Sequence, residues 1–438
     1  MAEGIRLQLF RWQVARDTQA PPAKDFATMP TSGTRPTAAL RWAMTALFAG
    51  MVMTDRFGIA IGSFPLGLTM PLAYVLLAVL LLEGRLALDA LSLAMFSALA
   101  TVGVVSFLLN ASVDGCSGTS ISSLSLMLAI YLPFVFTQAR QTDTQGHWLW
   151  MMRTAGNVLL IVAIAGIVQF YAQFVIRTPW LFDISKLIPD PIRAQGIYNS
   201  AIPVGSTFKA NGLFCREPSN FSFWMALGLL IELTLFKRVQ RMLCFGLALL
   251  LSYSGTGLLT LAFGLLFPFR PRMLAWVGAA LVLILGSNAL AGDPLNLAFT
   301  LNRSGEFSAR GSSAYARYVA PMFLVDANFD SSPWSIWLGH GPGTIQKNVA
   351  AFDSHDPTWA KLLFEYGIAG FVACLGFVAY RLSRFAAPFQ FRAVLFANWL
   401  VMGGYLLTPE TVYLLYVVLA MWPGPAPGDA ASGRQALA

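Results

Sequence analysis

Residues 354–370 read SHDPTWAKLLFEYGIAG, a polar loop that runs directly into a hydrophobic helix. The loop carries His355 and Asp356, and the start of the helix carries Lys361 and Glu365. Histidine is well suited to accept a proton from a hydroxyl near neutral pH, and a neighbouring carboxylate can orient it. An ionisable residue at depth in an apolar helix is a functional candidate by default. The stretch therefore predicts the wall of an active site at a membrane edge, with a purely structural cluster as the alternative.

The composition around this stretch is typical of a membrane protein. The chain is 56% hydrophobic and 11% charged, whereas soluble domains carry about 25% charged residues. Apolar runs close to the length of a bilayer crossing predict helices, since the strands of a membrane barrel show short alternating patterns. The formal charge of +8 lies mostly in short connections between these runs. We expect an all-α, polytopic membrane protein without a nucleic-acid partner.

About twelve apolar segments are predicted to be transmembrane helices. The sequence SYSGT at 252–256 interrupts one apolar run, which leaves open a tight hairpin or one long broken helix. The segments lie near residues 37–53, 66–83, 91–110, 121–138, 150–175, 217–236, 240–253, 255–269, 273–290, 358–380, 391–407 and 409–423.

Charge predicts how these helices are oriented. With the N-terminus in the cytoplasm, the short outer connections hold one basic residue, Arg56, and the short inner connections are rich in arginine and lysine, as the positive-inside rule requires. Four helices separate the two large loops, so both loops emerge on the outer face and can build one site. The expected parts are a tail at 1–36, helices one to five at 37–175, a loop at 176–216, helices six to nine at 217–290, a loop at 291–357, helices ten to twelve at 358–423 and a tail at 424–438.

The two large loops are basic although they lie on the outer side. A solvated basic surface explains this, because long loops are exempt from the charge rule. An anion site is the alternative, since guanidinium groups bind phosphate bidentately and a lipid diphosphate is the anion expected at a bilayer edge. The basic residues are Arg177, Lys186, Arg193, Lys209 and Arg216 in the first loop and Arg303, Arg310, Arg317 and Lys347 in the second.

Two segments of these loops lead into helices. NGLFCREPS at 211–219 places Pro218 in a first helical turn, where proline is favoured, and Glu217 just before it. There Arg216 can hold a phosphate and Glu217 can handle a proton, or the two form only a surface ion pair. In the second segment, 302–318, Arg310 and Arg317 lie two helical turns apart, and phosphate binds well at a helix N-terminus flanked by serine and glycine.

His340 lies in a glycine-rich turn, LGHGPG at 338–343. It either contacts substrate or serves only as a turn residue. The chain has no CxxC pair and no cluster of histidine and cysteine, so no metal is expected.

The order of these motifs resembles a known family. REPS at 216–219 opens a helix, YSGTG follows at 253–257, an arginine-bearing loop and LGHGPG come next, and HDPTWAKLLFEYGIAG closes the series at 355–370. Together they resemble the O-antigen ligase and polymerase superfamily, and most closely its Wzy-type exopolysaccharide polymerases. The resemblance covers about residues 196–380.

This resemblance implies a GT-C-like, metal-independent glycosyltransferase of the bacterial inner membrane, with no cofactor and a periplasmic active site. It implies transfer of a growing glycan from undecaprenyl diphosphate onto a new lipid-linked repeat unit, with inversion at the anomeric carbon. Arg216, Arg310, Arg317 and Arg303 would bind the diphosphate, and His355 or Glu217 would activate the acceptor hydroxyl. His340, Asp356, Lys361 and Glu365 would line the site. Further expected partners are membrane lipid, a chain-length regulator and export proteins.

Three other functions remain open at this point. One is a ligase that moves a finished glycan to another acceptor. Another is a polysaccharide transporter or flippase, which would more often show inverted repeats and charges near the bilayer midplane. The third is a non-enzymatic scaffold for an export complex, which leaves the two basic loops unexplained.

Overall fold

The computed structural model describes residues 36–423, apart from 62–63, 114–117, 140–142, 177, 195–199, 330–333, 386 and most of 267–301. Four described helices are long and apolar enough to cross a membrane. They are α4 (Ala90–Val113), α6 (Thr144–Ala172), α7 (Pro218–Ile231, continued as π-helix to Phe236) and α14 (Thr358–Arg384).

The shorter apolar helices account for most of the other predicted segments. Half of the residues of the predicted helix at 273–290 are described, and each of these is helical. Because only four described helices are by themselves long and apolar enough to cross a membrane, the number of membrane crossings stays a prediction. The shorter helices are α2 (Ala38–Met53), α3 (Thr69–Leu82), α5 (Ile121–Tyr131), α8 (Val239–Leu251), α9 (Gly255–Leu266), α15 (Phe389–Val401) and α16 (Pro409–Leu415, continued as π-helix to Ala420).

The all-α prediction needs a correction, because the described residues also form three small antiparallel sheets. In the first, β1 (Gly58–Ile61) pairs with β2 (Phe64–Gly67), where only a short connection was expected. In the second, β3 (Leu86–Leu88) pairs with β4 (Phe136–Gln138), so the helix predicted at 121–138 ends early. In the third, β5 (Pro203–Val204) pairs with β6 (Thr207–Phe208). Apolar composition alone does not separate such short strands from helix ends.

Side-chain caps explain several helix starts. Thr37 accepts a hydrogen bond from the Leu40 amide, Ser120 from the Ser123 amide and Asp143 from the Gly146 amide. Each cap satisfies one backbone N–H group that has no partner within the helix.

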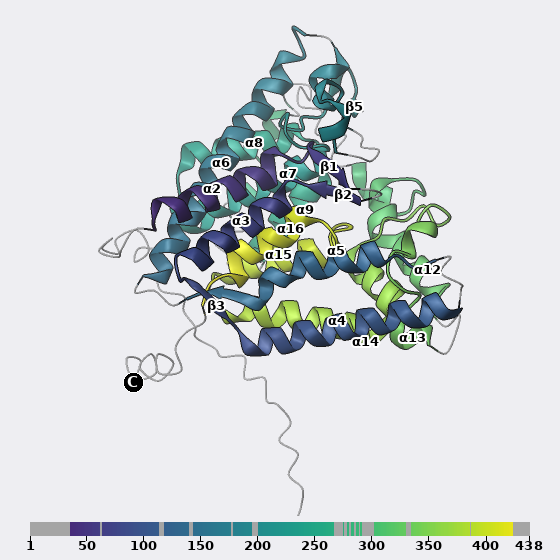
Figure 1. Ribbon diagram of the computed structural model, residues 1–438. Coiled ribbons are helices and arrows are strands. Elements are labelled where there is room, and N and C mark those ends of the chain that lie inside the picture. Colours follow the sequence, from purple (N-terminus) through teal and green to yellow (C-terminus); the bar gives the residue numbers. More distant parts are fainter. Residues whose placement is uncertain are drawn as a thin grey trace, which may run out of the picture.

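Helix α7 lies within the bundle, packed against α6, α8 and α9. Its side chains from Phe221 to Leu227 are all buried. Glycine permits the close approach of α9, since a Cβ at Gly257 would lie 2.4 Å from the Ser222 carbonyl oxygen. Helix α14 packs against α4 on another side of the bundle (Figure 1).

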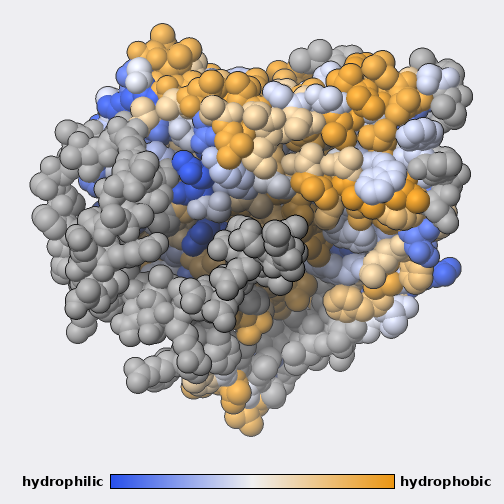
Figure 2. Space-filling view, turned by 90° about the horizontal axis from the view of Figure 1, so that it is seen from below, coloured by the Kyte–Doolittle hydropathy of each residue, from blue (hydrophilic) through white to orange (hydrophobic). Residues whose placement is uncertain are grey.

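Both large loops lie at one end of the bundle. Figure 1 shows β5 of the first loop, and α12 (Ala320–Asp326) and α13 (Ser335–Leu338) of the second, towards the same end as β1 and β2. The β3–β4 sheet lies towards the opposite end. Viewed from the side of α4 and α14, the surface shows broad hydrophobic areas (Figure 2). Exposed apolar side chains such as Leu91, Val104 and Leu108 on α4 suit contact with lipid.

Arg56 anchors the first large loop from the connection that follows α2. Its side chain is 1% exposed. The guanidinium donates hydrogen bonds to the carbonyl oxygens of Leu213 (2.7 Å), Phe182 (3.1 Å) and Cys215 (2.6 Å). It also donates to the Ser185 hydroxyl at 2.7 Å. Arg56 therefore binds both ends of the loop just before α7 begins.

A second buried network supports the same loop. Gln169 of α6 accepts hydrogen bonds from the amides of Asn211 (3.0 Å) and Gly212 (3.1 Å). The Asn211 side chain donates to the carbonyl oxygens of Phe182 and Ser200. Gly212 adopts φ +70°, a conformation that glycine reaches without a steric penalty. These contacts fix the direction in which the chain enters α7.

Candidate active site

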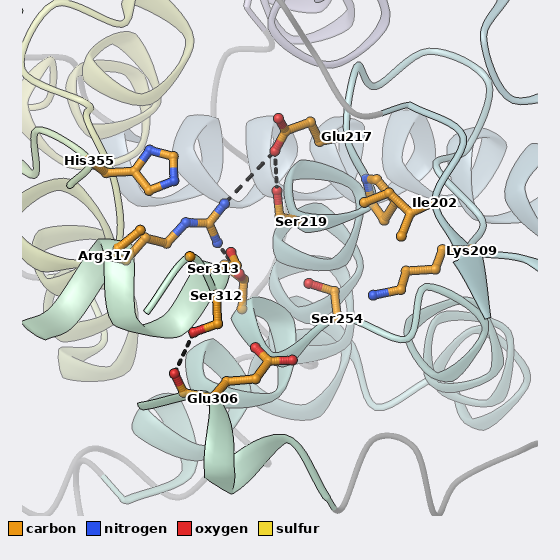
Figure 3. Close-up of a pocket in the computed structure, with 14 residues that line it drawn as sticks. Ile202, Lys209, Glu217, Ser219, Ser254, Glu306, Ser312, Ser313, Arg317 and His355 are labelled. Carbon is orange, nitrogen blue, oxygen red and sulfur yellow. Dashed lines mark hydrogen bonds and ion pairs between the residues drawn. The ribbon is translucent and has the colours of Figure 1, made fainter. Parts of the chain in front are cut away.

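A cavity of about 410 Å³ lies where the two large loops meet the helices. Residues far apart in the sequence surround it (Figure 3). Its lining combines two carboxylates, two cations, one histidine and several hydroxyl groups. These are Glu217, Glu306, Lys209, Arg317, His355, Ser219, Ser254, Thr256, Ser312 and Ser313.

Arg317 and Glu217 face each other in this cavity. Nη2 of Arg317 lies 3.8 Å from Oε2 of Glu217, and the Ser219 hydroxyl donates to the same oxygen at 3.0 Å. Nη1 of Arg317 donates to the Thr256 hydroxyl at 3.0 Å. The structure thus joins the start of α7, the start of α9 and the second loop around one ion pair.

Three helical segments begin at the cavity wall. Pro218 opens α7, Gly255 opens α9 between the lining residues Ser254 and Thr256, and a third helical segment runs from Ser313 to Asp326. The first N–H groups of a helix lack partners within the helix and carry partial positive charge. Converging helix starts with serine and threonine hydroxyls form a setting that favours a phosphate group.

His355 lines the cavity next to Arg317 (Figure 3). Its amide donates to the Ala316 carbonyl oxygen at 2.8 Å, which ties the loop before α14 to the segment that carries Arg317. Partial burial and the Arg317 charge lower the pKa of His355, although Asp356 and Glu217 act in the opposite direction. The imidazole therefore favours its neutral form, which can accept a proton.

Asp356, Lys361 and Glu365 form a separate buried cluster rather than lining this cavity. Oδ2 of Asp356 accepts hydrogen bonds from Lys361 (2.9 Å) and Gln346 (2.7 Å). Nζ of Lys361 lies 3.8 Å from Glu365, whose carboxylate also accepts the Ile345 amide at 3.4 Å. Lys361 is 4% and Glu365 0% exposed. These contacts join the loop before α14 to the first turns of that helix.

His340 also takes a structural position. Its Nε2 lies 2.9 Å from the Asn328 carbonyl oxygen, and its ring packs on Phe364 with 4.7 Å between centroids. The flanking turn packs against a kink in α14 at Gly367, which adopts φ +63°. A Cβ at Gly367 would lie 2.4 Å from the Trp337 carbonyl carbon. His340 is thus part of the contact between the glycine-rich turn and α14.

Arg216 lines a different cavity from Arg317, although it immediately precedes Glu217 in the sequence. Its Nε donates to Asp55 at 2.7 Å, and its amide donates to the same carboxylate at 2.9 Å. It lines a second cavity of about 50 Å³ with Asp55 and Glu410. The predicted grouping of Arg216 with Arg317 is therefore not seen in the large cavity, because an aspartate from the connection after α2 binds it.

The other two predicted arginines lie on the segment before Arg317. Arg310 is exposed and immediately precedes the cavity residues Gly311, Ser312 and Ser313. Arg303 lies in a 3-10 helix (Asn302–Phe307), and its side chain is outside the described part of the structure.

Sequence reasoning left several cavity residues out of the candidate site. In the sequence Lys209 is one of several basic residues of its loop, and Ser254 and Thr256 lie in a break between apolar runs. Glu306 carried no signal of its own. YSGTG was the one available indication, because a polar break that starts a helix is a place for an anion. Within the described residues, no group of three or more histidine, cysteine, aspartate or glutamate side chains is arranged to hold a metal ion.

Comparison with known proteins places this fold and site in a family. No curated protein matches the chain significantly. The family model described as WcaD colanic acid polymerase matches residues 43–422, which include both large loops and every described cavity residue. This confirms the resemblance to Wzy-type repeat-unit polymerases. The chain belongs to the WcaD colanic acid polymerase family.

Proposed function

We propose that this protein polymerises polysaccharide repeat units at the periplasmic face of the bacterial inner membrane. It transfers the growing glycan from undecaprenyl diphosphate to the terminal sugar of a new lipid-linked repeat unit. Family membership supports a glycosyltransferase-type polymerase, and the apolar helices support a membrane location. In this proposal about twelve helices cross the membrane and the N-terminus is cytoplasmic.

One observation carries the proposal: an anion-binding wall and a proton acceptor share one cavity. Arg317, together with the starts of α7 and α9, forms the anion-binding wall. His355 and Glu217 lie beside it as proton acceptors. Transfer of a sugar from a diphosphate needs both, since negative charge develops on the leaving group while the acceptor hydroxyl loses a proton.

The step is a displacement at the anomeric carbon. The acceptor oxygen forms the new glycosidic bond while the bond between the anomeric carbon and the phosphate oxygen breaks. The electron pair leaves with the diphosphate, whose charge Arg317 and the helix starts stabilise. The hydroxyl proton passes to His355, whose lowered pKa keeps the imidazole neutral near pH 7. Attack opposite the leaving group inverts the anomeric centre.

Glu217 is the alternative proton acceptor. Its side chain forms an ion pair with Arg317 and accepts the hydrogen bond from Ser219. In the proposal Glu217 orients Arg317, and in its absence the guanidinium would be free to turn towards other acceptors. The proposed step needs no metal ion, because Arg317 and the helix starts supply positive charge at the leaving group.

The lipid-linked glycan profile of cells tests the proposal. The gene is deleted and then complemented with wild type, Arg317→Gln, His355→Gln or, as a matched control, Arg193→Gln. Arg193 lies in the first loop, paired with exposed Asp190 outside the cavity. We expect single repeat units to accumulate on the carrier in the deletion strain and in the two cavity variants, with polymer restored by wild type and the control. Full-length polymer accumulating on the carrier would indicate a ligase, and an unchanged profile would refute both functions.

A further inference from the structure

Lys209 is a cation that the reaction proposed above does not use. It follows the β5–β6 hairpin, and its amide donates to the Ile202 carbonyl oxygen at 3.0 Å. The next amide, that of Ala210, donates to the Leu251 carbonyl oxygen at 3.0 Å. The backbone around Lys209 is therefore held between the first loop and the end of α8.

The side chain of Lys209 is buried but belongs to the cavity wall. It is 7% exposed and lines the same cavity as Arg317. The ammonium group of Lys209 therefore contributes positive charge to a cavity that Arg317 also lines.

Lys209 and Arg317 lie on opposite sides of this cavity (Figure 3). The Lys209 side chain extends towards Ser254, and Arg317 donates to Thr256. Ser254 and Thr256 flank the first residue of α9. The start of one helix thus separates two cations, which is an arrangement suited to two linked anionic groups.

We propose that Lys209 determines specificity by binding the second phosphoryl group of a polyprenyl diphosphate. One phosphoryl group lies at Arg317 and Thr256, and the other lies at Lys209 and Ser254. The cavity then selects a lipid diphosphate over a lipid monophosphate. This inference rests on the proposed function, because it assigns a residue to the leaving group of that reaction.

Lipid binding by the full-length protein in nanodiscs tests this assignment. Affinities for undecaprenyl diphosphate and undecaprenyl monophosphate are measured for wild type, Lys209→Gln, Ser254→Ala and the control Lys186→Gln. Lys186 is a 74% exposed lysine of the same loop, close to Asp183. Wild type and control should prefer the diphosphate. Lys209→Gln should lose about 10-fold in diphosphate affinity, as expected for a hydrogen bond to a charged group, and keep its monophosphate affinity within about twofold.

An equal loss for both lipids, or no loss for either, would overturn the role of Lys209. The second result would also arise if Lys209 instead binds a carboxylate of an acidic sugar, which bare lipids lack. If Lys209→Gln does not fold, Ser254→Ala provides the test. Its affinity for the diphosphate lipid should fall by less than 10-fold, while its affinity for the monophosphate lipid should not change. Wild-type protein that binds neither lipid would count against the proposed function itself. Wild-type polymerisation together with an unchanged preference in Lys209→Gln would refute only the present inference.

Discussion

Removing the Arg56 guanidinium should open the first large loop. This side chain is 1% exposed and donates to the carbonyl oxygens of Leu213, Phe182 and Cys215. Arg56→Met keeps most of the aliphatic volume but removes this donor from the Leu213 and Cys215 carbonyl groups, whereas the Phe182 carbonyl keeps its hydrogen bond from Asn211. A buried polar group that loses its partner costs about 1–3 kcal/mol. Taking about 1.5 kcal/mol for each of the two carbonyl groups, since water from the nearby cavities can replace part of the donor, the loop is destabilised by roughly 3 kcal/mol.

Amide hydrogen exchange measures this effect directly. A change of roughly 3 kcal/mol in the free energy of local opening corresponds to about 100-fold faster exchange. The increase should be confined to peptides covering residues 182–194 and 200–216, with little change in α14. Arg193→Met is the matched control, because Arg193 is partly exposed and pairs with Asp190, which is 82% exposed. Exchange in the control should stay within about twofold of wild type.

Unchanged exchange in Arg56→Met would refute this reasoning. It would mean that the network of Gln169 and Asn211 holds the loop without Arg56. A uniform increase across all helices would also contradict it, because Arg56 would then support the whole bundle rather than this loop.

Three further predictions concern the cavity and α14. Arg317→Lys should lower the transfer rate roughly 100-fold with little change in thermal stability, because a lysine cannot contact Thr256 and the substrate phosphate together as a planar guanidinium does. An in vitro transfer assay measures this rate, and a wild-type rate in the variant would contradict the prediction. Because the pKa of His355 is lowered from 6.5, the transfer rate should stay level down to about pH 6.5 and fall only below it. The free energy of unfolding should also fall as the pH drops from 6.5 towards the lowered pKa, because the unfolded state then binds more protons. A pH–rate profile of His355→Gln with the same fall at acid pH would indicate that Glu217 is the base. Gly367→Ala should destabilise the protein by about 3 kcal/mol, because the residue adopts φ +63° and an added Cβ would overlap the Trp337 backbone. Thermal melting measures this loss. The control Gly246→Ala in α8 has open space around the added Cβ and should be neutral or slightly stabilising.

Much of the architecture could be predicted from local sequence patterns. Apolar runs identify helices without knowledge of their neighbours, since each backbone hydrogen bond in a helix is made within the segment. Counting the crossings between the two large loops placed them on the same face, and the structure has them at one end of the bundle. The same local signals led to Glu217, Arg317 and His355, which the structure brings into one cavity.

The predicted phosphate-binding group was less well determined. Arg216 and Glu217 are adjacent in the sequence, yet they line different cavities. Sequence neighbours at a helix start point in different directions, and Asp55, far away in the chain, binds Arg216. The sequence predicts Glu365 and Lys361 in the site, but they lie on one face of α14 and form a cluster with Asp356 outside the large cavity.

Lys209 lines the cavity, although the sequence does not predict it as a site residue. Nothing in its immediate sequence distinguishes it from Lys186, which is exposed in the same loop. Lys209 is buried, and the next residue, Ala210, donates a hydrogen bond to Leu251 at the end of α8, which is distant in the sequence. The sequence alone determined which segments form apolar helices and which residue types lie in the loops between them, because those properties depend on local composition. Only the tertiary structure decided which charges face the cavity, because that depends on contacts between residues that are distant in the chain.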